Sequence, residues 1–316
     1  LGYDRDEGIQ NDPYSYKAAR DWQESALGRQ TIAGQLQLVD GVTFPSSPLN
    51  GLVLGCRTAT VALNYTNCPV FGTSFNDAGT ATQAYDFGIR ATQPSGTSAG
   101  SGFAIGGDGL NPGPMALLST PSIRNSIFVR ADYDLSDQLN VYIEANYARM
   151  KTRPEGGAPT STFINANPLG FRLARNYAYL PTDLATAMDA NNLTAIYVQK
   201  HFPNNTKNPM ESRTSRIVAG ATYDFDDNWS GDFYYTYGET KSQMTLIDFG
   251  DTIAMANALT AVRDPVTGVV SCSTGGQYCV PWNIFGSERG SAQLEKYIMP
   301  IDYFFNSNYQ QALEAT

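Results

Sequence analysis

Few residues of this chain have the types and spacing that catalysis requires. His201 is the single histidine, and no serine stands in a G-x-S-x-G elbow, so the sequence does not indicate a Ser-His-Asp triad. The glycines at 100, 102, 106, 107 and 109 lack the spacing of a dinucleotide-binding loop, and no G-x-x-x-x-G-K-[ST] phosphate loop occurs. With one histidine and no C-x-x-C pair, a zinc site would need mixed ligands. We therefore expect no enzyme activity, no cofactor and no metal site.

Asp132 and Glu144 are the carboxylates that could act together as general acid and base on a glycoside. Both are expected on the polar face of neighbouring strands, where Arg130 can balance their charge and water can keep them ionised. We therefore interpret them as part of the lining of a water-filled lumen rather than as catalytic groups. The candidate lining residues are Arg130, Asp132, Tyr142, Glu144, Asp232 and Tyr234.

The four cysteines fall into two close pairs, each within a turn-rich polar stretch. Three pairings are formally possible, and closure within each pair is the simplest. We therefore expect the disulfides Cys56–Cys68 and Cys272–Cys279 in an oxidising compartment, with free thiols as the alternative.

The most distinctive stretch runs from Arg263 to Gly286 and contains the second cysteine pair. Its Asp-Pro and Thr-Gly steps set turns, and a Cys272–Cys279 bridge would hold a compact knob. A rigid knob that presents Trp282 and Phe285 could form a platform for a ligand. The alternative is that these two aromatic side chains only pack the knob.

The elements that must position these residues are two long β-hairpins, predicted by alternation of apolar and polar residues with a period of two. In the first hairpin the apolar positions are Ile127, Val129, Ala131, Tyr133 and Leu135, then Leu139, Val141, Ile143, Ala145 and Tyr147. In the second they are Ile217, Ala219, Ala221, Tyr223 and Phe225, then Trp229, Phe233, Tyr235 and Tyr237. Each hairpin therefore has one apolar face and one polar face.

The lengths of these arms and of their connections favour an outer-membrane β-barrel. Each arm reaches or exceeds the roughly 9–11 residues that cross a bilayer at barrel tilt. The turns at 135–138 and 225–228 are tight, whereas the other connections are very long, which is the asymmetry of bacterial barrels with short periplasmic turns and long extracellular loops. Aromatic residues that flank the tight turns suit an interfacial girdle, namely Tyr133, Tyr223, Phe225 and Trp229. The alternative is a long soluble sandwich whose apolar face packs on a second sheet.

We therefore predict an all-β, antiparallel meander of long transmembrane strands. The expected strands are about 123–135, 139–151, 212–226 and 229–246, with partial strands at 1–8 and 309–316 and long loops at 9–122, 152–211 and 247–308. Within the loops, residues 181–189 and 291–298 are expected to form helical turns, and the Gly-, Ser- and Pro-rich residues 94–114 a mobile segment. An open sheet of about six strands exposes two edges to lipid, so we expect further strands to lie outside this sequence.

Composition excludes two other classes of protein. The longest apolar runs, such as Ala195-Ile196-Tyr197-Val198, are far shorter than the ~20 residues of a transmembrane helix. The net charge is −9 and the pI about 4.6, so nucleic-acid binding is not expected. The N-terminal residues lack the basic and apolar regions of a signal peptide, although an outer-membrane protein must be exported. If the membrane interpretation holds, we expect the true start of the protein to lie further upstream.

The run Arg263-Asp264-Pro265-Val266-Thr267-Gly268, followed by Cys272 and by Cys279-Val280-Pro281-Trp282-Asn283-Ile284-Phe285-Gly286, resembles an extracellular loop of TonB-dependent outer-membrane receptors. The opening Tyr3-Asp4-Arg5-Asp6-Glu7-Gly8 and the Tyr-Asp-Leu/Phe-x-Asp turns also resemble mid-barrel segments of that family. The resemblance spans nearly the whole chain, and the loop run is its more specific part.

This resemblance implies a 22-stranded barrel, plugged by an N-terminal domain, that imports a scarce nutrient with energy relayed by the TonB complex. The sequence departs from the family pattern because it contains no plug domain, no TonB box and no terminal aromatic strand. We therefore expect a central barrel segment in the bacterial outer membrane, where the TonB complex acts through the missing plug region. The substrate could be a siderophore, an oligosaccharide or a similar small molecule. Two alternatives remain: a secreted β-rich glycan-binding or adhesin domain, and a glycoside-active enzyme with two carboxylates in a cleft.

Overall fold

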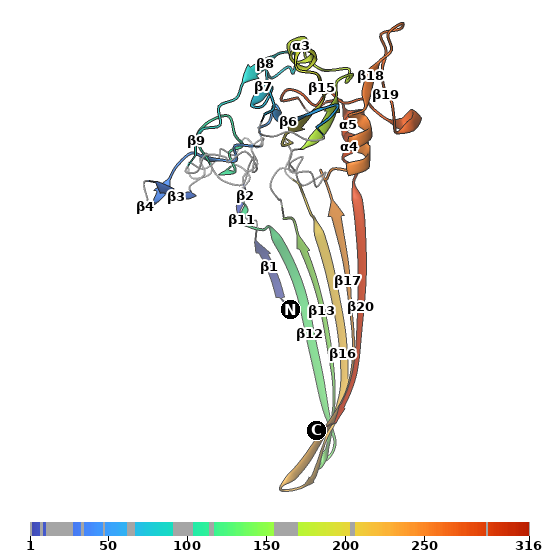
Figure 1. Ribbon diagram of the computed structural model, residues 1–316. Helices are drawn as coiled ribbons and strands as arrows, with labels where there is room; N and C mark the ends of the chain where they lie inside the picture. The colour runs from blue at the N-terminus through green and yellow to red at the C-terminus, as the bar shows by residue number, and fades with distance from the viewer. Residues whose placement is uncertain are drawn as a thin grey trace.

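A long antiparallel sheet and a separate head make up the computed structural model of the chain (Figure 1). The residues described are 2–6, 9–10, 28–32, 35–46, 48–61, 67–90, 104–113, 117–154, 170–202, 206–288 and 290–315. Strands dominate, and every pair of neighbouring strands is antiparallel. This confirms the predicted all-β, antiparallel fold class.

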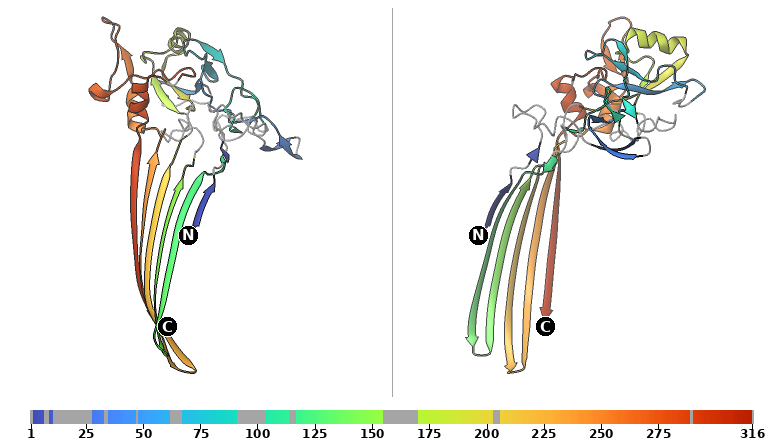
Figure 2. Two further views of the ribbon diagram at one scale, coloured as in Figure 1. Left: turned by 180° about the vertical axis from the view of Figure 1, so that it is seen from behind. Right: turned by 90° about the vertical axis from the view of Figure 1, so that its left-hand side faces the viewer.

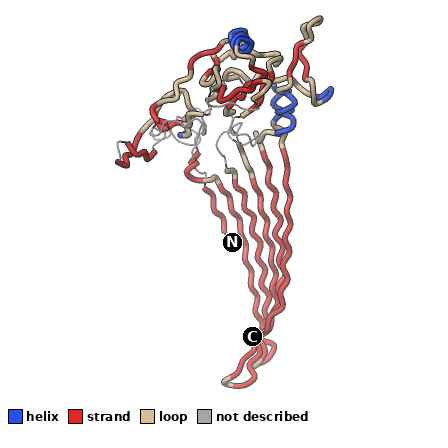
Figure 3. The backbone as a smooth tube through the Cα atoms, in the orientation of Figure 1, coloured by secondary structure: helices blue, strands red, loops and turns tan. Residues whose placement is uncertain are grey.

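The long sheet is a meander in which strands that follow one another along the sheet also follow one another in sequence, apart from the head segments between them. Its order is β1 (Gly2–Asp6), β12 (Ser122–Ser136), β13 (Leu139–Thr152), β16 (Met210–Asp226), β17 (Trp229–Leu246) and β20 (Asp302–Ala315). The last five strands contain 14 to 18 residues each. They run side by side from the tight turns at one end to the head at the other (Figure 3).

Side-chain hydrogen bonds fix the two tight turns. The carboxylate of Asp226 accepts hydrogen bonds from the backbone N–H groups of Asn228, at 2.8 Å, and Trp229, at 3.0 Å. In the first turn the Ser136 hydroxyl accepts from the N–H of Gln138 at 3.3 Å. Such local bonds stabilise a turn without help from the rest of the fold. The observed hairpin strands accordingly lie within two residues of the expected bounds.

The register places the alternating residues on two distinct faces of the long sheet. Ile127 is opposite Tyr147, Ile143 is opposite Ala219, and Tyr235 is opposite Leu313, so these residues share one side, the apolar face. The side chains on this face are exposed, including Ile143, Ile217, Phe233 and Leu313. The opposite side, the polar face, carries charged and hydroxyl side chains such as Arg130, Glu144 and Thr222. The sheet is a single curved layer, with the head at one end only (Figure 2).

The head consists of the described residues of the three long connections and has a hydrophobic core of its own. Its main sheet has the order β14 (Phe171–Ala174), β15 (Leu193–Gln199), β6 (Leu52–Thr58), β7 (Thr73–Phe75) and β8 (Thr82–Ala84). The helices are α3 (Thr182–Ala190), α4 (Thr252–Ala258), η2 (Gly276–Tyr278) and α5 (Ala292–Ile298). The smaller sheets pair β2 (Ile9–Gln10) with β11 (Leu117–Ser119), β3 (Gly28–Ile32) with β4 (Gln35–Val39), β18 (Ala261–Arg263) with β19 (Val270–Cys272), and β10 (Ala104–Ile105) with both β5 (Val42–Thr43) and β9 (Ile89–Arg90).

Three sequence expectations need correction. The connections were expected to be loops with little structure, but they pack together around buried side chains from all three, such as Val53, Ile196 and Met255. The last strand of the long sheet begins at Asp302, not near residue 309, because its register with β17 continues through three consecutive aromatic residues that hide the alternation. Helix α4 was not predicted, although Asp251 caps it by accepting from the N–H groups of Ile253 and Ala254. Most of the expected mobile segment at 94–114 lies outside the described residues.

None of the described helices is long and apolar enough to cross a membrane.

Candidate functional site

The six lining residues predicted from the sequence lie together on the polar face of the long sheet. They come from β12, β13 and β17, and β16 lies between the last two. The cross-strand pairs are Arg130 with Glu144, Asp132 with Tyr142, Gly220 with both Tyr142 and Tyr234, and Thr222 with Asp232. Side chains that are 90 positions apart in sequence therefore contact one another.

Arg130 is the centre of this lining. Its Nε lies 3.0 Å from both carboxylate oxygens of Asp132, and its Nη1 donates to Glu144 at 2.5 Å. The guanidinium also lies 4.7 Å from the centroid of the Tyr142 ring, a cation–π distance. Arg130 therefore donates hydrogen bonds to both carboxylates at once and holds them on either side of its guanidinium group.

A second group of hydrogen bonds links the lining across the sheet. Asp232 accepts a hydrogen bond from Thr222 Oγ1 at 3.0 Å and a longer one from Tyr142 Oη at 3.4 Å. Tyr234 Oη donates to the carboxylate of Glu314 on β20. The lining is thus a continuous polar surface of hydroxyl groups and carboxylates across the five strands β12, β13, β16, β17 and β20.

Gly220 shapes this lining, and its role was not predicted from the sequence. A Cβ atom at this position would lie 2.4 Å from Cζ of Tyr142, so the tyrosine ring lies directly over the glycine backbone. Only glycine leaves room for the ring there, and the ring in turn is held beside Asp232. The signal in the sequence was the glycine within an otherwise regular strand pattern, which often marks a close approach.

Carboxylates outnumber cations on this part of the polar face. Asp132, Glu144, Asp232 and Glu314 lie here, whereas Arg130 and Arg216 are the cations. An acidic surface interleaved with tyrosines favours polyhydroxylated or cationic ligands over anions, because carboxylates accept hydrogen bonds from hydroxyl and ammonium groups.

The structure contradicts the predicted ligand platform in the head. Trp282 and Phe285 are each only 2% exposed. The Trp282 ring packs against the rings of Phe171 and Phe202, with ring centroids 5.9 Å and 5.5 Å away. Phe285 lies against Phe75, with the ring centroids 4.2 Å apart. Both side chains therefore fill the core of the head, which is the alternative that the sequence left open.

Two buried polar side chains tie the segment from Trp282 to Gly286 to the core. Tyr177 Oη donates to the Trp282 carbonyl and accepts from the N–H of Ile284 at 3.2 Å; burial raises the pKa of this hydroxyl. Lys200 Nζ donates to the carbonyl oxygens of Ile284, at 3.0 Å, and Gly286, at 2.5 Å. Burial lowers the pKa of Lys200 to about 7. This lysine therefore has a structural role, and its neighbour His201 is also buried.

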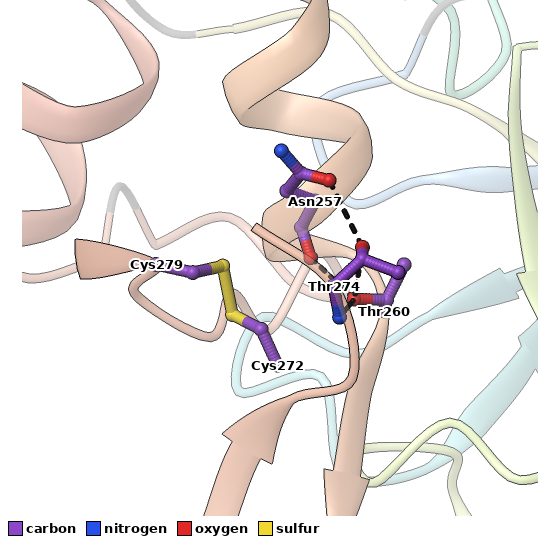
Figure 4. The surroundings of a disulfide bond; sticks show 5 residues. All are labelled: Asn257, Thr260, Cys272, Thr274 and Cys279. Carbon is purple, nitrogen blue, oxygen red and sulfur yellow. Dashed lines mark hydrogen bonds between the residues drawn. A yellow bond between two sulfur atoms is a disulfide. The ribbon is translucent and has the colours of Figure 1, made fainter. Parts of the chain in front are cut away.

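Both predicted disulfides are present. Cys56 and Cys68 have Cα atoms 5.5 Å apart, and Cys272 and Cys279 have Cα atoms 6.1 Å apart. Beside the second bridge, Thr274 donates to the side chain of Asn257 at 2.9 Å, and Thr260 donates to its backbone carbonyl at 2.7 Å (Figure 4). These bonds attach the knob to helix α4.

The exposed side chains of the knob are different from those predicted. Val266 is 91% exposed, and Tyr278 is 79% exposed. The hairpin formed by β18 and β19 projects from the head (Figure 1). This hairpin, rather than Trp282 or Phe285, is the part of the knob that meets the surroundings.

Comparison with known proteins gives no relative for this chain: no family model, no curated protein and no solved structure matches it.

Proposed function

We propose that this chain is a central barrel segment of an outer-membrane TonB-dependent transporter, which takes up a scarce nutrient such as a siderophore or an oligosaccharide. The observation that carries the proposal is the apolar face of the long sheet. Its side chains remain about half exposed across five strands, for example Ile143 at 51%, Phe233 at 50% and Leu313 at 66%. The described part of the head does not cover them.

Such a face needs an apolar environment. Soluble monomers rarely expose a contiguous apolar patch larger than a few hundred Å². Complete burial of an isoleucine side chain contributes roughly 1.5–3 kcal/mol, and Ile143 has 51% of its surface left to bury. Summed over the side chains of the apolar face, this free energy strongly favours a position out of water. A lipid bilayer provides that environment along the whole face, without a partner surface that must fit it.

The dimensions of the apolar face fit a bilayer. In the stretches 127–135, 139–147 and 217–225 no charged residue lies on the apolar face. Each stretch covers about nine residues, close to the roughly 9–11 that cross the hydrocarbon region at barrel tilt. Tyr133, Phe225 and Trp229 are exposed beside the tight turns, where an aromatic girdle would meet the membrane surface.

The polar face supports the transport part of the proposal. In a barrel this face lines the lumen, where water keeps Arg130, Asp132 and Glu144 charged. The head stands opposite the tight turns, on the side where bacterial barrels carry their long external loops. A nutrient would meet the head first and the acidic, tyrosine-rich lining next.

The alternative is a secreted β-rich domain that binds glycans or acts as an adhesin. The disulfide-linked head with its own core favours it, since disulfides persist in oxidising compartments. This alternative requires a second protein surface on the apolar face. It therefore predicts a water-soluble protein.

Expression of this sequence with its genomic flanks in a Gram-negative host tests the proposal. We expect the product in the outer-membrane fraction, with electrophoretic mobility that changes on heating, and we expect nutrient uptake to stop when TonB is deleted. A product that remains soluble and folded without detergent would favour the secreted domain instead. Membrane location with uptake independent of TonB would reject the energy-coupled mechanism alone.

A further inference from the structure

A row of cations crosses the apolar face near the head. The register places Arg149 of β13 opposite Arg213 of β16, which is opposite Lys241 of β17. All three share a face with Tyr147, Ile217 and Tyr237, because they lie an even number of positions from them. The next row towards the head adds Lys151 and Glu211. Towards the tight turns the same face is uncharged below Glu239.

The cations are more exposed than the anions that hold them. Glu211 accepts from Arg149 at 2.9 Å and from Arg213 at 2.6 Å, and it lies 3.5 Å from Lys151. Glu239 accepts from Lys241 at 2.8 Å. The two glutamate side chains are 24% and 20% exposed, whereas those of Arg213 and Lys241 are 56% and 59% exposed. The two glutamates thus hold four cations in place, Arg149, Lys151, Arg213 and Lys241. Positive charge is therefore in excess here and lies outermost on this side of the sheet.

A hollow of about 710 Å³ continues this basic region towards the head. Its lining includes three cations, Arg5, Lys151 and Arg153, and two carboxylates, Asp6 and Glu211. Strand residues of both faces line it, but more of them lie on the apolar side of the sheet, namely Arg5, Ile123, Lys151, Glu211, Gln243 and Thr245. Since residues two apart share a face, the hollow lies at the strand ends and opens mainly on the apolar side of the sheet.

The order of these features along the strands matches the order of groups in an acylated phospholipid. The apolar rows come first, then exposed tyrosines such as Tyr147 and Tyr309, then the cation row and the hollow. Arginine and lysine bind phosphate oxygens through charge-assisted hydrogen bonds. The chain as a whole carries a net charge of −9, so this concentration of positive charge is confined to one part of the molecule.

We propose that the row formed by Arg149, Arg213 and Lys241, together with the hollow lined by Arg5, Lys151 and Arg153, binds the phosphate groups of an acylated lipid in the leaflet on the head side. This inference rests on the proposed function, which places the apolar face in a bilayer. It adds a lipid site on the outside of the barrel, separate from the nutrient path along the polar face. The site fixes the depth at which the strands lie in the membrane.

Lipid selectivity of the protein with its flanks, reconstituted in phosphatidylcholine vesicles, tests this site. Electron paramagnetic resonance measures the motionally restricted fraction of spin-labelled phosphatidic acid and of spin-labelled phosphatidylcholine. We expect the wild-type protein to prefer phosphatidic acid. We expect Arg213→Gln with Lys241→Gln to reduce that preference by roughly thirtyfold, because each of the two surface cations attracts an anionic lipid by about 1 kcal/mol.

The matched control removes two cations from the polar face at a similar height, Arg124→Gln with Arg216→Gln. It should leave the preference unchanged. Competition by inorganic phosphate, at an ionic strength matched with chloride, separates the lipid from a soluble anion. We expect no displacement of the lipid, and displacement would overturn the proposal in favour of a free phosphate site.

Three further results would overturn it. If the wild-type protein inserts but shows no preference, or if both double variants lose the preference equally, the lipid site is wrong while the proposed function survives. If the wild-type protein does not insert, the proposed function fails and the lipid site fails with it. Should the Arg213→Gln/Lys241→Gln protein not fold, salt titration of the wild type decides, since the preference must fall as ionic strength rises.

Discussion

Replacement of Ile143 by arginine places a charge in the central row of the apolar face. Ile143 lies opposite Ala131 on one side and Ala219 on the other, and Tyr235 and Leu313 complete the row. The row lies midway between the tight turns and Tyr147. The side chain is 51% exposed, so arginine fits there without a steric clash.

The expected cost depends on what surrounds this row. At the middle of a bilayer an arginine on the lipid side of a barrel costs roughly 2–4 kcal/mol, and near the interface the cost falls to about 0–1 kcal/mol. At an exposed position in water a substitution usually changes stability by less than about 0.5 kcal/mol. The larger cost corresponds to roughly a 30-fold to several-hundredfold change in the folding equilibrium.

The assay is reversible denaturation of the protein with its flanks from lipid vesicles, followed by tryptophan fluorescence. Ser215→Arg is the first control, since Ser215 lies on the same face opposite Tyr147 near the cation row. Asn146→Arg is the second, because it lies on the polar face. We expect a large loss only for Ile143→Arg. Equal and small losses for Ile143→Arg and Ser215→Arg would refute the bilayer interpretation.

Three further predictions concern the head. The free energy of unfolding of the head should rise with pH between about 7 and 10. The reason is that the pKa of Lys200 is lowered to about 7 in the folded protein, so only the unfolded chain keeps the lysine protonated across that interval. Lys200→Met should flatten this pH dependence in thermal unfolding followed by circular dichroism, and an unchanged slope would reject the lowered pKa. Trp282→Ala should cost about 3–5 kcal/mol in chemical denaturation, whereas Tyr278→Ala should change little, and similar effects of the two would contradict the buried position of Trp282. Replacement of both Cys56 and Cys68 by serine should lower the free energy of unfolding by about 3 kcal/mol by the loop-entropy relation. The reduced wild type should lose more than this variant, because the reductant also breaks Cys272–Cys279, and a reducing-agent titration checks this.

The long hairpins could be predicted from the sequence because their signals are local. Apolar and polar residues alternate within each strand, and the turn residues fix the register, as Asp226 does for Asn228 and Trp229. The shared face of Arg130, Glu144, Tyr142 and Asp232 follows from that alternation alone. The contacts among these residues could not be predicted from the alternation, since the placement of Tyr142 over Gly220 depends on the register of β13 with β16.

The head could not be predicted because its contacts join distant parts of the chain. β15 pairs with β6 across more than one hundred residues, for example at Ile196 with Cys56. The sequence left open whether Trp282 and Phe285 form a ligand platform or pack the knob, because a short turn-rich segment gives no sign of what covers it. Phe75, Phe171 and Phe202, which bury them, come from two other connections.

Spin-label accessibility at positions 143 and 144 of β13 tests the central claim most directly. Each position receives one added cysteine and one label in the membrane-reconstituted protein with its flanks, and relaxation by oxygen is compared with relaxation by a polar nickel complex. We predict that the label at 143 is relaxed by oxygen, which dissolves in lipid, and not by the nickel complex, whereas the label at 144 is relaxed by the nickel complex in the aqueous lumen. A label at 143 that neither reagent reaches would mean that protein covers the apolar face, and one that both reach would mean water, so either result would contradict a membrane-spanning sheet.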